Sequence, residues 1–531
     1  MNLKLTIGGK EIEARENLLD RAIRFVDPIL ANQRLQARFS AAAAGSYFGG
    51  SRSRRAMKTW GPPGGDADAD LLPDLSALRE RSRDLVRNAP IATGAINTTC
   101  TNVIGTGLIM HSQIDPGVLG MTEAEAEEWE KRADLEWQLW SESPECDSER
   151  KLNFAGIQEL CFRQVLENGD VLVNIPRFKR GIFPYFTKLQ VIEADRLCNP
   201  DGKTDTETIM AGVEKDEHGA PKAYHILKQH PGAAIMRKPR EWDHVAAFSN
   251  KSELPNILHL FRVLRPGQTR GLPFLAPIIE PLKQLDRYTE AEIMAAVVSS
   301  MFTVFVKTES GETEFAEMVG TSGNDTRKAG EEDYKLGSGT IVGLTRDQDV
   351  EFANPGRPNQ AFEPFITSLM NQMGMSLEIP REILMKCFTT SYTAARAAFI
   401  EAWKFFSSRR QWTVTSLCGP IYEIFLYEAI ASGRLHAPGF FADPLIRKAY
   451  CGATWTGPAK GMIQEVDEIV AAGKRIEISL STREKETAEL TGGSWEKNLA
   501  QLKKEQVQLI DAKLPTFQEK TVLNLPAPTR D

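Results

Sequence analysis

The sequence lacks the features that mark an exported, disulfide-linked or membrane-spanning protein. Its seven cysteines are odd in number, scattered and never arranged as CxxC, which predicts buried thiols in a reducing compartment and neither a disulfide framework nor a zinc site. The N-terminus alternates apolar and polar residues around Gly8 and Gly9, so we expect no secretory signal. The most apolar window, residues 293–306, is shorter than the roughly 20 residues that span a bilayer. It predicts a buried helix.

The chain also lacks an excess of positive charge. The chain has 64 Lys and Arg against 71 Asp and Glu, a formal net charge of -7. A protein that coats nucleic acid draws its affinity from many cationic contacts with phosphates, so this composition excludes that class. Any relationship with DNA is therefore expected to be loose or local.

Known catalytic patterns are missing as well. We find no P-loop, GxSxG or HExxH motif, and the seven histidines are dispersed. His225 and His230 are the closest pair, in strand and turn text that favours surface histidines over metal ligands. Two acidic groups favour a solvated loop over a metal site: Glu312, Glu314 and Glu317, and Glu331, Glu332 and Asp333. We expect no catalytic residue, metal or cofactor, although a catalytic site can be assembled in space.

The 531 residues, 42% of them apolar, predict a sizeable core and several packed regions of mixed α+β class. Near the start we expect a helix over 15–39, then a basic arm and a turn-rich stretch after Trp60. The next helix is expected to be capped by Asp74 and to end before Pro90. Its Arg79, Arg83 and Arg87 share one face, which is either a phosphate-facing stripe or a solvated face paired with acidic neighbours.

Hydropathy patterns predict the remaining elements. An acidic helix over 121–145 carries an apolar stripe of Trp129, Ala133, Trp137 and Trp140. Short alternating runs over 153–265 predict a mostly antiparallel β region. Helices follow at 273–307 and 362–377, separated by an expected strand pair at 336–344 and 348–355. The sequence then predicts helices over 392–432 and 463–509, and the tail from Pro515 is expected to be disordered.

Residues 259–279 (HLFRVLRPGQTRGLPFLAPII) are the most distinctive stretch of the chain. They closely resemble the RPGQxRGxP hallmark of lambda-type tailed-phage portal proteins. The hallmark positions are Arg265, Pro266, Gly267, Gln268, Arg270, Gly271 and Pro273. The resemblance continues in the family's order at 81–96, 192–200, 212–226, 374–388 and 391–398, the last with Tyr392 and Arg396. Residues 391–396 depart from the family's Asn-Tyr-Ser-Ser-x-Arg, and the usual late Asp-Pro step is missing.

The resemblance implies a structural subunit that has no catalytic residue of its own. Portals of this family form a ring, usually of twelve copies, at a capsid vertex, through which double-stranded DNA passes during packaging and ejection. The implied partners are the terminase large subunit, head-completion or tail connector proteins, and the major capsid and scaffold proteins, with no membrane. The implied location is the virion, after assembly in the host cytoplasm.

The resemblance implies a division of this chain into nine regions. They are an N-terminal helix and arm (1–60), an α+β wing (61–272), a first stem helix (273–307), a clip-like insertion (308–360), a second stem helix (361–377), a tunnel loop (378–391), a helical wing and tunnel region (392–460), a helical crown (461–510) and a tail (511–531).

In this plan, Arg381 and Lys386 of the tunnel loop are the candidates for contact with passing DNA, and the alternative is that they are ordinary loop cations. Ile293, Val297, Phe302 and Val306 pack either on a neighbouring subunit or in the chain's own core. An acidic channel wall would not trap phosphates, so we expect negligible affinity of the isolated protein for duplex DNA at physiological salt. Tight, sequence-independent binding in a mobility-shift assay would contradict this expectation.

Two other classes remain open at this point. One is a phage assembly enzyme, a nuclease or protease with an unrecognised site, which would need a spatial cluster of acids or histidines. The other is a capsid or scaffold component, which would form shells or sheets. A portal forms discrete rings.

Overall fold

Two units make up the chain, Met1–Asp66 and Ala67–Asp531. The computed structural model describes residues 2–7, 10–15, 23, 25, 27–31, 33–34, 55–57, 59–235, 240–300, 304–308, 348–352, 361–388, 391–461 and 464–512. In the first unit, β1 (Asn2–Ile7) pairs antiparallel with β2 (Lys10–Arg15), which fits the alternating pattern around Gly8. The helix expected over 15–39 falls partly outside the described residues, and those described at 28–31 are helical.

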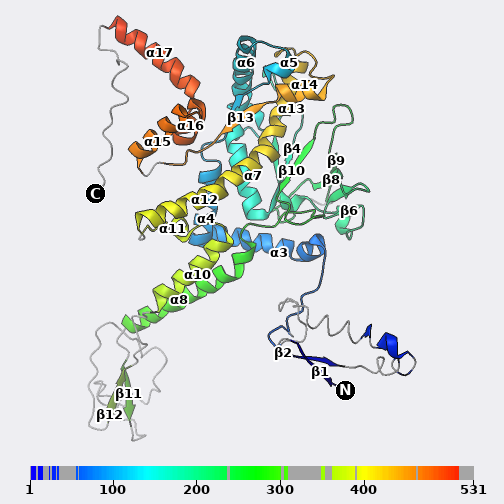
Figure 1. The fold of residues 1–531 in the computed structure, drawn as a ribbon, viewed down its shortest axis with the longest axis vertical. Coiled ribbons are helices and arrows are strands. Elements are labelled where there is room, and N and C mark those ends of the chain that lie inside the picture. The colour runs from blue at the N-terminus through cyan, green and yellow to red at the C-terminus, as the bar shows by residue number, and fades with distance from the viewer. Residues whose placement is uncertain are drawn as a thin grey trace, which may run out of the picture. The chain divides into compact units, whose positions relative to one another are not determined.

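The second unit contains most of the described helices and strands (Figure 1). Its α-helices are α3 (Ala67–Asn88), α4 (Pro90–Val103), α5 (Pro116–Leu119), α6 (Glu123–Ser141), α7 (Phe154–Asn168), α8 (Ile279–Ser300), α10 (Phe362–Ser376), α11 (Arg381–Leu384), α12 (Tyr392–Thr413), α13 (Gly419–Ala431), α14 (Pro444–Tyr450), α15 (Glu465–Glu477), α16 (Arg483–Thr491) and α17 (Trp495–Asp511). Its strands are β3 (Ile109–Ser112), β4 (Asp170–Asn174), β5 (Gln190–Glu193), β6 (Ile209–Met210), β7 (Val213–Lys215), β8 (Pro221–Leu227), β9 (Trp242–Ala246), β10 (Ile257–Phe261), β11 (Val304–Thr308), β12 (Gln348–Phe352) and β13 (Ala453–Thr456).

The sheets are small, and every described pairing between named strands is antiparallel. One sheet has the order β10-β4-β5 and another the order β6-β7-β8-β9, as expected for residues 153–265. Within that region, however, Phe154–Asn168 is the helix α7, capped by the Asn153 side chain. Its apolar residues recur at helical spacing and are buried, so the β prediction was wrong there. β13 pairs with β3 and joins segments that are distant in sequence.

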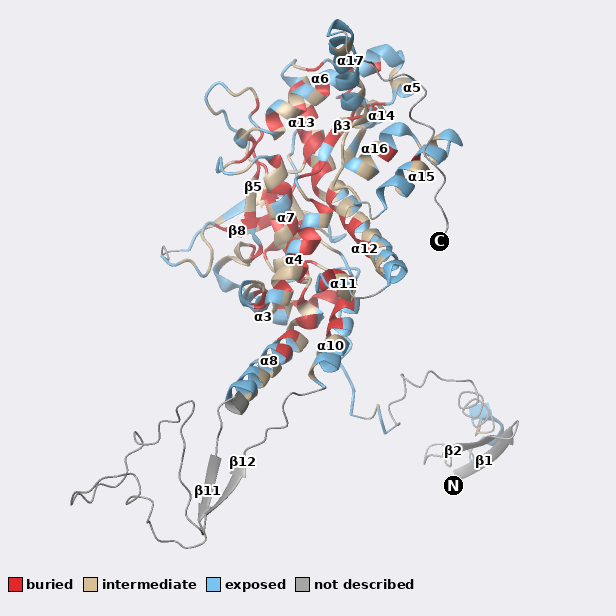
Figure 2. Ribbon diagram, turned by 90° about the vertical axis from the view of Figure 1, so that its left-hand side faces the viewer, coloured by how far each residue is buried: buried red, intermediate tan, exposed pale blue. Residues whose placement is uncertain are grey.

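A cluster of aromatic side chains forms the centre of the core. The predicted stripe of α6 is buried, and the Trp137 ring lies 5.1–5.9 Å from four other aromatic rings in edge-on orientation. These rings belong to Phe154, Tyr422, Phe425 and Trp455. Figure 2 shows this burial in α7, α13 and the strands beside them. The core therefore joins residues 137–154 to residues 422–455.

Two helices expected from apolar periodicity are present, with one change of bounds. α8 and α10 lie side by side, and the Tyr288 ring stacks on Phe362 at 5.7 Å (Figure 1). The expected helix over 273–307 was wrong at both ends, because α8 starts at Ile279 after a 3₁₀ turn and residues 304–308 form β11. Short apolar runs rich in β-branched residues fit helix or strand alike, and pairing with β12 decides the matter.

Residues 348–352 of the expected strand 348–355 form β12, but its expected partner strand is not described. β12 pairs with β11, whereas residues 336–344 lie outside the described residues. The apolar part of α8 is not buried in the chain either, since Ile293 and Met294 are each 58% exposed and Val297 is 41% exposed. The side chains of Phe302 and Val306 lie outside the described residues. The buried-helix prediction for 293–306 therefore fails on the single chain.

Helix boundaries elsewhere agree in part with expectation. α3 ends before Pro90 as expected, but it starts at Ala67, so Asp74 lies inside it and is not its cap. From Tyr392 to Ala431 the chain is helical through α12, a π-helical turn (Val414–Cys418) and α13. The polar helical text after 463 forms α15, α16 and α17, and the tail from Pro515 lies outside the described residues. None of the described helices is both long and apolar enough to cross a membrane.

Candidate functional site

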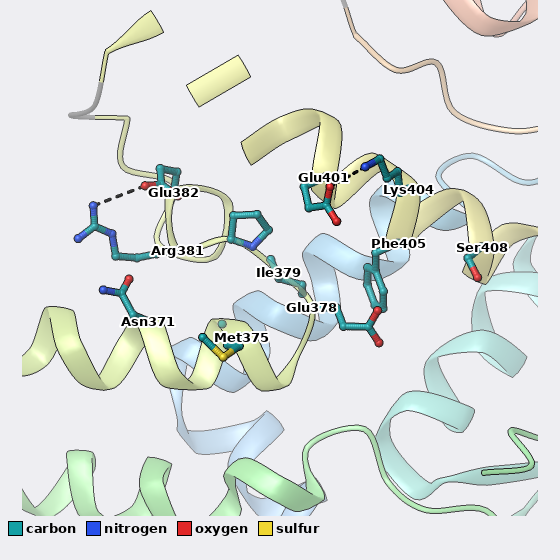
Figure 3. Close-up of a pocket in the computed structure, with 12 residues that line it drawn as sticks. Asn371, Met375, Glu378, Ile379, Arg381, Glu382, Glu401, Lys404, Phe405 and Ser408 are labelled. Carbon is teal, nitrogen blue, oxygen red and sulfur yellow. Dashed lines mark hydrogen bonds and ion pairs between the residues drawn. The ribbon is translucent and has the colours of Figure 1, made fainter. Parts of the chain in front are cut away.

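The predicted tunnel loop lies beside an open pocket of about 620 Å³ (Figure 3). α10 contributes Asn371 and Met375 to its lining, and α12 contributes Phe405 and Ser408. The segment 378–382 lines one side of the pocket. Residues 381–384 of the expected loop form the single helical turn α11. Pro380 is the N-cap of that turn and has a φ of -56° and an extended ψ of 145°.

The two predicted DNA-contacting cations differ in their surroundings. Arg381 is partly buried, and its Nη2 lies 3.5 Å from Glu382 Oε1, as the dashed line in Figure 3 marks. Lys386 is exposed and has a φ of 52°. Within the described part of the chain, no carboxylate pairs with Lys386. Lys386 is therefore the freer of the two to meet a phosphate.

Glu378 anchors the start of this loop on α12. Its carboxylate lies 3.0 Å from Arg409 Nη2, and the Arg409 guanidinium also covers the Phe405 ring at 4.6 Å. Burial, together with the charge of nearby Arg262, lowers the pKa of Arg409 to about 10, while Glu378 opposes both effects. One largely exposed carboxylate thus offsets the charges of two neighbouring guanidinium groups, Arg262 and Arg409, and holds the loop against α12.

Arg270, at the centre of the hallmark, is buried, and its guanidinium donates four hydrogen bonds. It donates to Asp170 Oδ2 at 2.6 Å and to the backbone oxygens of Ala194, Leu197 and Ala211 at 2.7–2.9 Å. The guanidinium donates to oxygens on several sides, as its planar donor array allows. Arg270 therefore connects β4 to the segments 194–197 and 209–213.

Asp170 is the buried centre of the same network. Its carboxylate accepts hydrogen bonds from Arg79 (2.6 Å), Arg270 (2.6 Å) and His259 (3.0 Å). Burial by itself would raise the pKa of Asp170, but the charges of Arg270 and Arg79 and the His259 hydrogen bond outweigh it and lower this pKa below its ordinary range. The carboxylate is therefore ionised at neutral pH, and both arginines depend on it.

Both expectations for the arginine face of α3 are wrong at its first two positions. Arg79 is 4% exposed and joins Asp170, and Arg83 pairs with Asp195. Arg87 alone is largely exposed, with Asp84 at 3.9 Å. The stripe therefore neither faces phosphate nor lies wholly in solvent, because residues about 90 to 110 positions away supply the partners.

The hallmark glycine Gly271 permits a close backbone approach. A Cβ added at this position would lie 1.9 Å from the backbone oxygen of Gly169, which itself has a φ of 90°. This contact is with backbone, so moving a flexible side chain cannot relieve it. The chain needs glycine here so that the hallmark can pack against the start of β4.

We expect Gly271→Ala to destabilise the protein by at least about 3 kcal/mol, the upper end of the usual cost of overpacking, because two backbone segments must separate. Gly94→Ala, inside α4 with open space around the added Cβ, is the matched control. It should be neutral or stabilising by up to about 1 kcal/mol, since alanine favours helix. Urea unfolding of the purified chains measures both. Equal stabilities of the two variants would contradict this account of the hallmark.

The other hallmark residues shape the turn before Arg270. Gly267 has a φ of 80°, and Gln268 accepts from the backbone NH of Leu264 at 2.8 Å and donates to the Arg270 oxygen at 2.7 Å. Arg265 pairs with Asp70 on α3 while about half exposed. Pro266 is exposed at the turn, and Pro273 is buried and precedes α8 by several residues. The expectation that Pro273 starts a helix was wrong.

Tyr392 and Arg396 lie at the start of α12 and are both exposed, one helical turn apart. Ser391 caps this helix by accepting from the Ala394 NH at 3.4 Å. The two family residues thus share an outward face of α12. They take no part in the chain's own core.

Three residues that the sequence did not bring together could hold a metal ion. Glu214, His225 and His244 each place one ligand atom within 4.8 Å of the others. His225 was expected on the surface, but its side chain is only 13% exposed and it lies opposite His244 in the sheet. The sequence offered no signal, because three different strands contribute these side chains.

Comparisons with known proteins give consistent results along most of the chain. The family model described as phage portal protein, lambda family, matches residues 53–410. Portal protein B of Escherichia phage lambda is 24% identical over 488 residues, which cover 88% of this chain and 90% of that protein. The portal protein of Escherichia phage N15 is 24% identical over 484 residues, with the same coverage of both chains.

Solved structures give weaker likenesses. The neck of an empty GTA particle computed with C6 symmetry has a TM-score of 0.44 at 12% identity, covering 83% of this chain and 99% of that chain. The neck of a native GTA particle computed with C12 symmetry has a TM-score of 0.42 at 11% identity, covering 81% of this chain and 95% of that chain.

Proposed function

This chain belongs to the lambda family of phage portal proteins, and we propose that its copies close into a ring, of twelve by our expectation, around a channel for double-stranded DNA at one capsid vertex. The chain is a structural portal subunit, because the family model covers most of it and the family is structural and not enzymatic. The nuclease or protease alternative and the capsid or scaffold alternative have no comparable support.

The pair α8 and α10 is the observation that carries the ring proposal. These helices support each other through Tyr288 and Phe365, whose rings lie 5.0 Å apart, yet Ile293, Met294 and Val297 of α8 remain exposed. Apolar side chains on a helix that projects from the core favour burial by a partner. In a closed ring, the face of one copy would cover a different face of the next. We therefore assign α8 and α10 to the stem.

The remaining regions of the family plan are part of the same proposal. We place the clip-like insertion at 308–360, the tunnel loop at 378–391 and the crown at 461–510, where α15 to α17 lie. Terminase large subunit would dock on the ring during packaging, and head-completion or tail connector proteins would replace it. Major capsid and scaffold proteins would surround it after assembly in the host cytoplasm.

Single-particle electron microscopy of the purified full-length chain tests the proposal. Closed rings with a channel wide enough for duplex DNA are the expected result. Val297→Asp, which places a charge on the exposed face of α8, should reduce the fraction of rings, whereas the same change at a solvated position such as Ser76 should not. A small oligomer without a channel, or extended sheets, would contradict the ring.

The tunnel-loop proposal makes a separate prediction about packaging. Replacing both Arg381 and Lys386 with Ala should reduce the amount of DNA packaged, because a polar wall would lose its contacts with the passing phosphates. Lys386→Ala alone should account for most of the loss, since Arg381 already pairs with Glu382. Lys404→Ala, which removes a cation paired with Glu401 at 2.8 Å, is the control. Nuclease-protected DNA in an assembled packaging reaction measures the effect, and normal packaging by the double variant would refute the proposal.

A further inference from the structure

The outer face of the four-stranded sheet carries a cluster that the portal function does not use. Within this sheet, β8 and β9 pair so that His225 lies directly opposite His244. Glu214 on β7 lies opposite Ala223, two residues before His225 on β8. Side chains of paired residues, and of every second residue, share a face of a sheet. All three side chains therefore gather on the face opposite the one that carries Tyr224 and Ile226.

The distances within this cluster suit one small cation. Glu214 Oε2 lies 3.0 Å from His244 Nε2 and 3.9 Å from His225 Nε2, and all three ligand atoms lie within 4.8 Å of one another. Ligands bound at ~2.0–2.1 Å around tetrahedral zinc are separated by roughly 3.3 Å. The histidine rings, whose centroids are 4.9 Å apart, need only small rotations to reach that spacing.

His225 Nε2 carries the argument beyond a simple ion pair. This atom is buried and has no hydrogen-bond partner among the described residues, since the carboxylate at 3.9 Å is too far away. Buried polar atoms in folded proteins almost always have a partner. The hydrogen bond between His244 and Glu214 leaves this nitrogen unsatisfied, whereas a metal ion between the three side chains would satisfy it.

We propose that Glu214, His225 and His244 bind one Zn²⁺ per chain, with the fourth position taken by water. Two imidazole nitrogens and one carboxylate oxygen are a donor set that zinc accepts, and calcium and magnesium prefer oxygen alone. Lys222 lies 3.9 Å from the other carboxylate oxygen, Oε1, so Oε2 stays directed at the histidines. The ion would join β7, β8 and β9, and it would restrain β9, which among the described strands pairs only with β8.

Isothermal titration of ZnCl₂ into the metal-free full-length chain at neutral pH tests the proposal. We expect one equivalent to bind, and His244→Ala and Glu214→Gln each to weaken the affinity at least about 100-fold, beyond the roughly 10–100-fold effect of losing an outer partner. His244 is the main test because its side chain is 58% exposed on β9, so its removal leaves the core intact. His218→Ala is the control, since His218 is exposed on the turn between β7 and β8.

Co²⁺ provides a second readout that a purely structural role would not move. The wild-type chain should give the intense visible absorption of a low-coordinate cobalt site, and the His225→Ala variant should lose it. Equal Zn²⁺ affinity in all variants, including His218→Ala, would mean nonspecific surface binding and overturn the proposal. No binding by the wild-type chain would overturn it as well.

Discussion

Asp170→Asn is expected to cost about 3–5 kcal/mol of the free energy of unfolding and to leave much of the chain insoluble. The substitution keeps the shape of the side chain but removes the charge that Arg79 and Arg270 share. Both guanidiniums are buried, and a buried charge without its partner costs far more than the pair contributes when intact. The amide also presents an NH₂ group to donors that need an acceptor.

The control is Asp70→Asn, in a second ion pair of the same hallmark. Asp70 pairs with Arg265, and both side chains are about half exposed. Exposed pairs contribute up to about 1 kcal/mol, because water already solvates both charges. Urea unfolding of the two variants, followed by tryptophan fluorescence, gives the comparison. If Asp170→Asn were no more harmful than Asp70→Asn, the hallmark arginine would not depend on Asp170.

The free energy of unfolding at acidic pH should also depend on Asp170. Because Arg270 and Arg79 hold the pKa of Asp170 below its unfolded value, the folded state binds this proton more weakly than the unfolded state does. Its contribution is therefore complete at neutral pH and is lost as the pH falls below about 4, where the unfolded carboxyl takes up a proton. Variants at Asp170 should lack this part of the acid dependence.

Trp137→Ala is the second change with a large expected effect, at about 3–5 kcal/mol. The ring is 4% exposed and makes edge-on contacts with four aromatic rings from α7, α13 and β13. Its removal leaves a cavity that rigid aromatic neighbours cannot fill. Because the cluster joins α6 and α7 to α13 and β13, the loss should weaken the packing of all four elements.

Leu135→Ala is the matched control on the same helix. Leu135 is 68% exposed, so its truncation should change the free energy of unfolding by no more than about 0.5 kcal/mol. Near-ultraviolet circular dichroism of the unassembled chain adds a direct measure of aromatic packing. A native spectrum for Trp137→Ala at wild-type stability would contradict the central role of this cluster.

The sequence by itself determined the elements with strong local periodicity and the family. The tryptophan stripe of α6, the helix α10 and the helical run after Tyr392 follow from spacing that buries one face. The hallmark at 265–273 identified the portal family because several unrelated motifs occur in order. Such features are local in the chain, so no knowledge of distant residues is needed to recognise them.

Where a short apolar run fits helix and strand alike, only the tertiary structure decided which of the two forms. Residues 304–308 form a strand because β12 pairs with them. Residues 154–168 form a helix within a region of mostly β-type sequence, because Asn153 caps it and one face of α7 is buried. Local propensity is a weak guide to secondary structure at such places, because strand pairing and burial contribute more to the free energy of folding.

The partners of charged and glycine residues were likewise a matter of tertiary structure. The sequence predicts an exposed Arg79, whereas in the structure Arg79 is buried and pairs with Asp170, 91 residues away. Gly271 is required because Gly169 lies against it, and His225 meets His244 across two strands. Each depends on the free energy of contacts between distant segments, and spacing along the chain carries no information about which segments will meet.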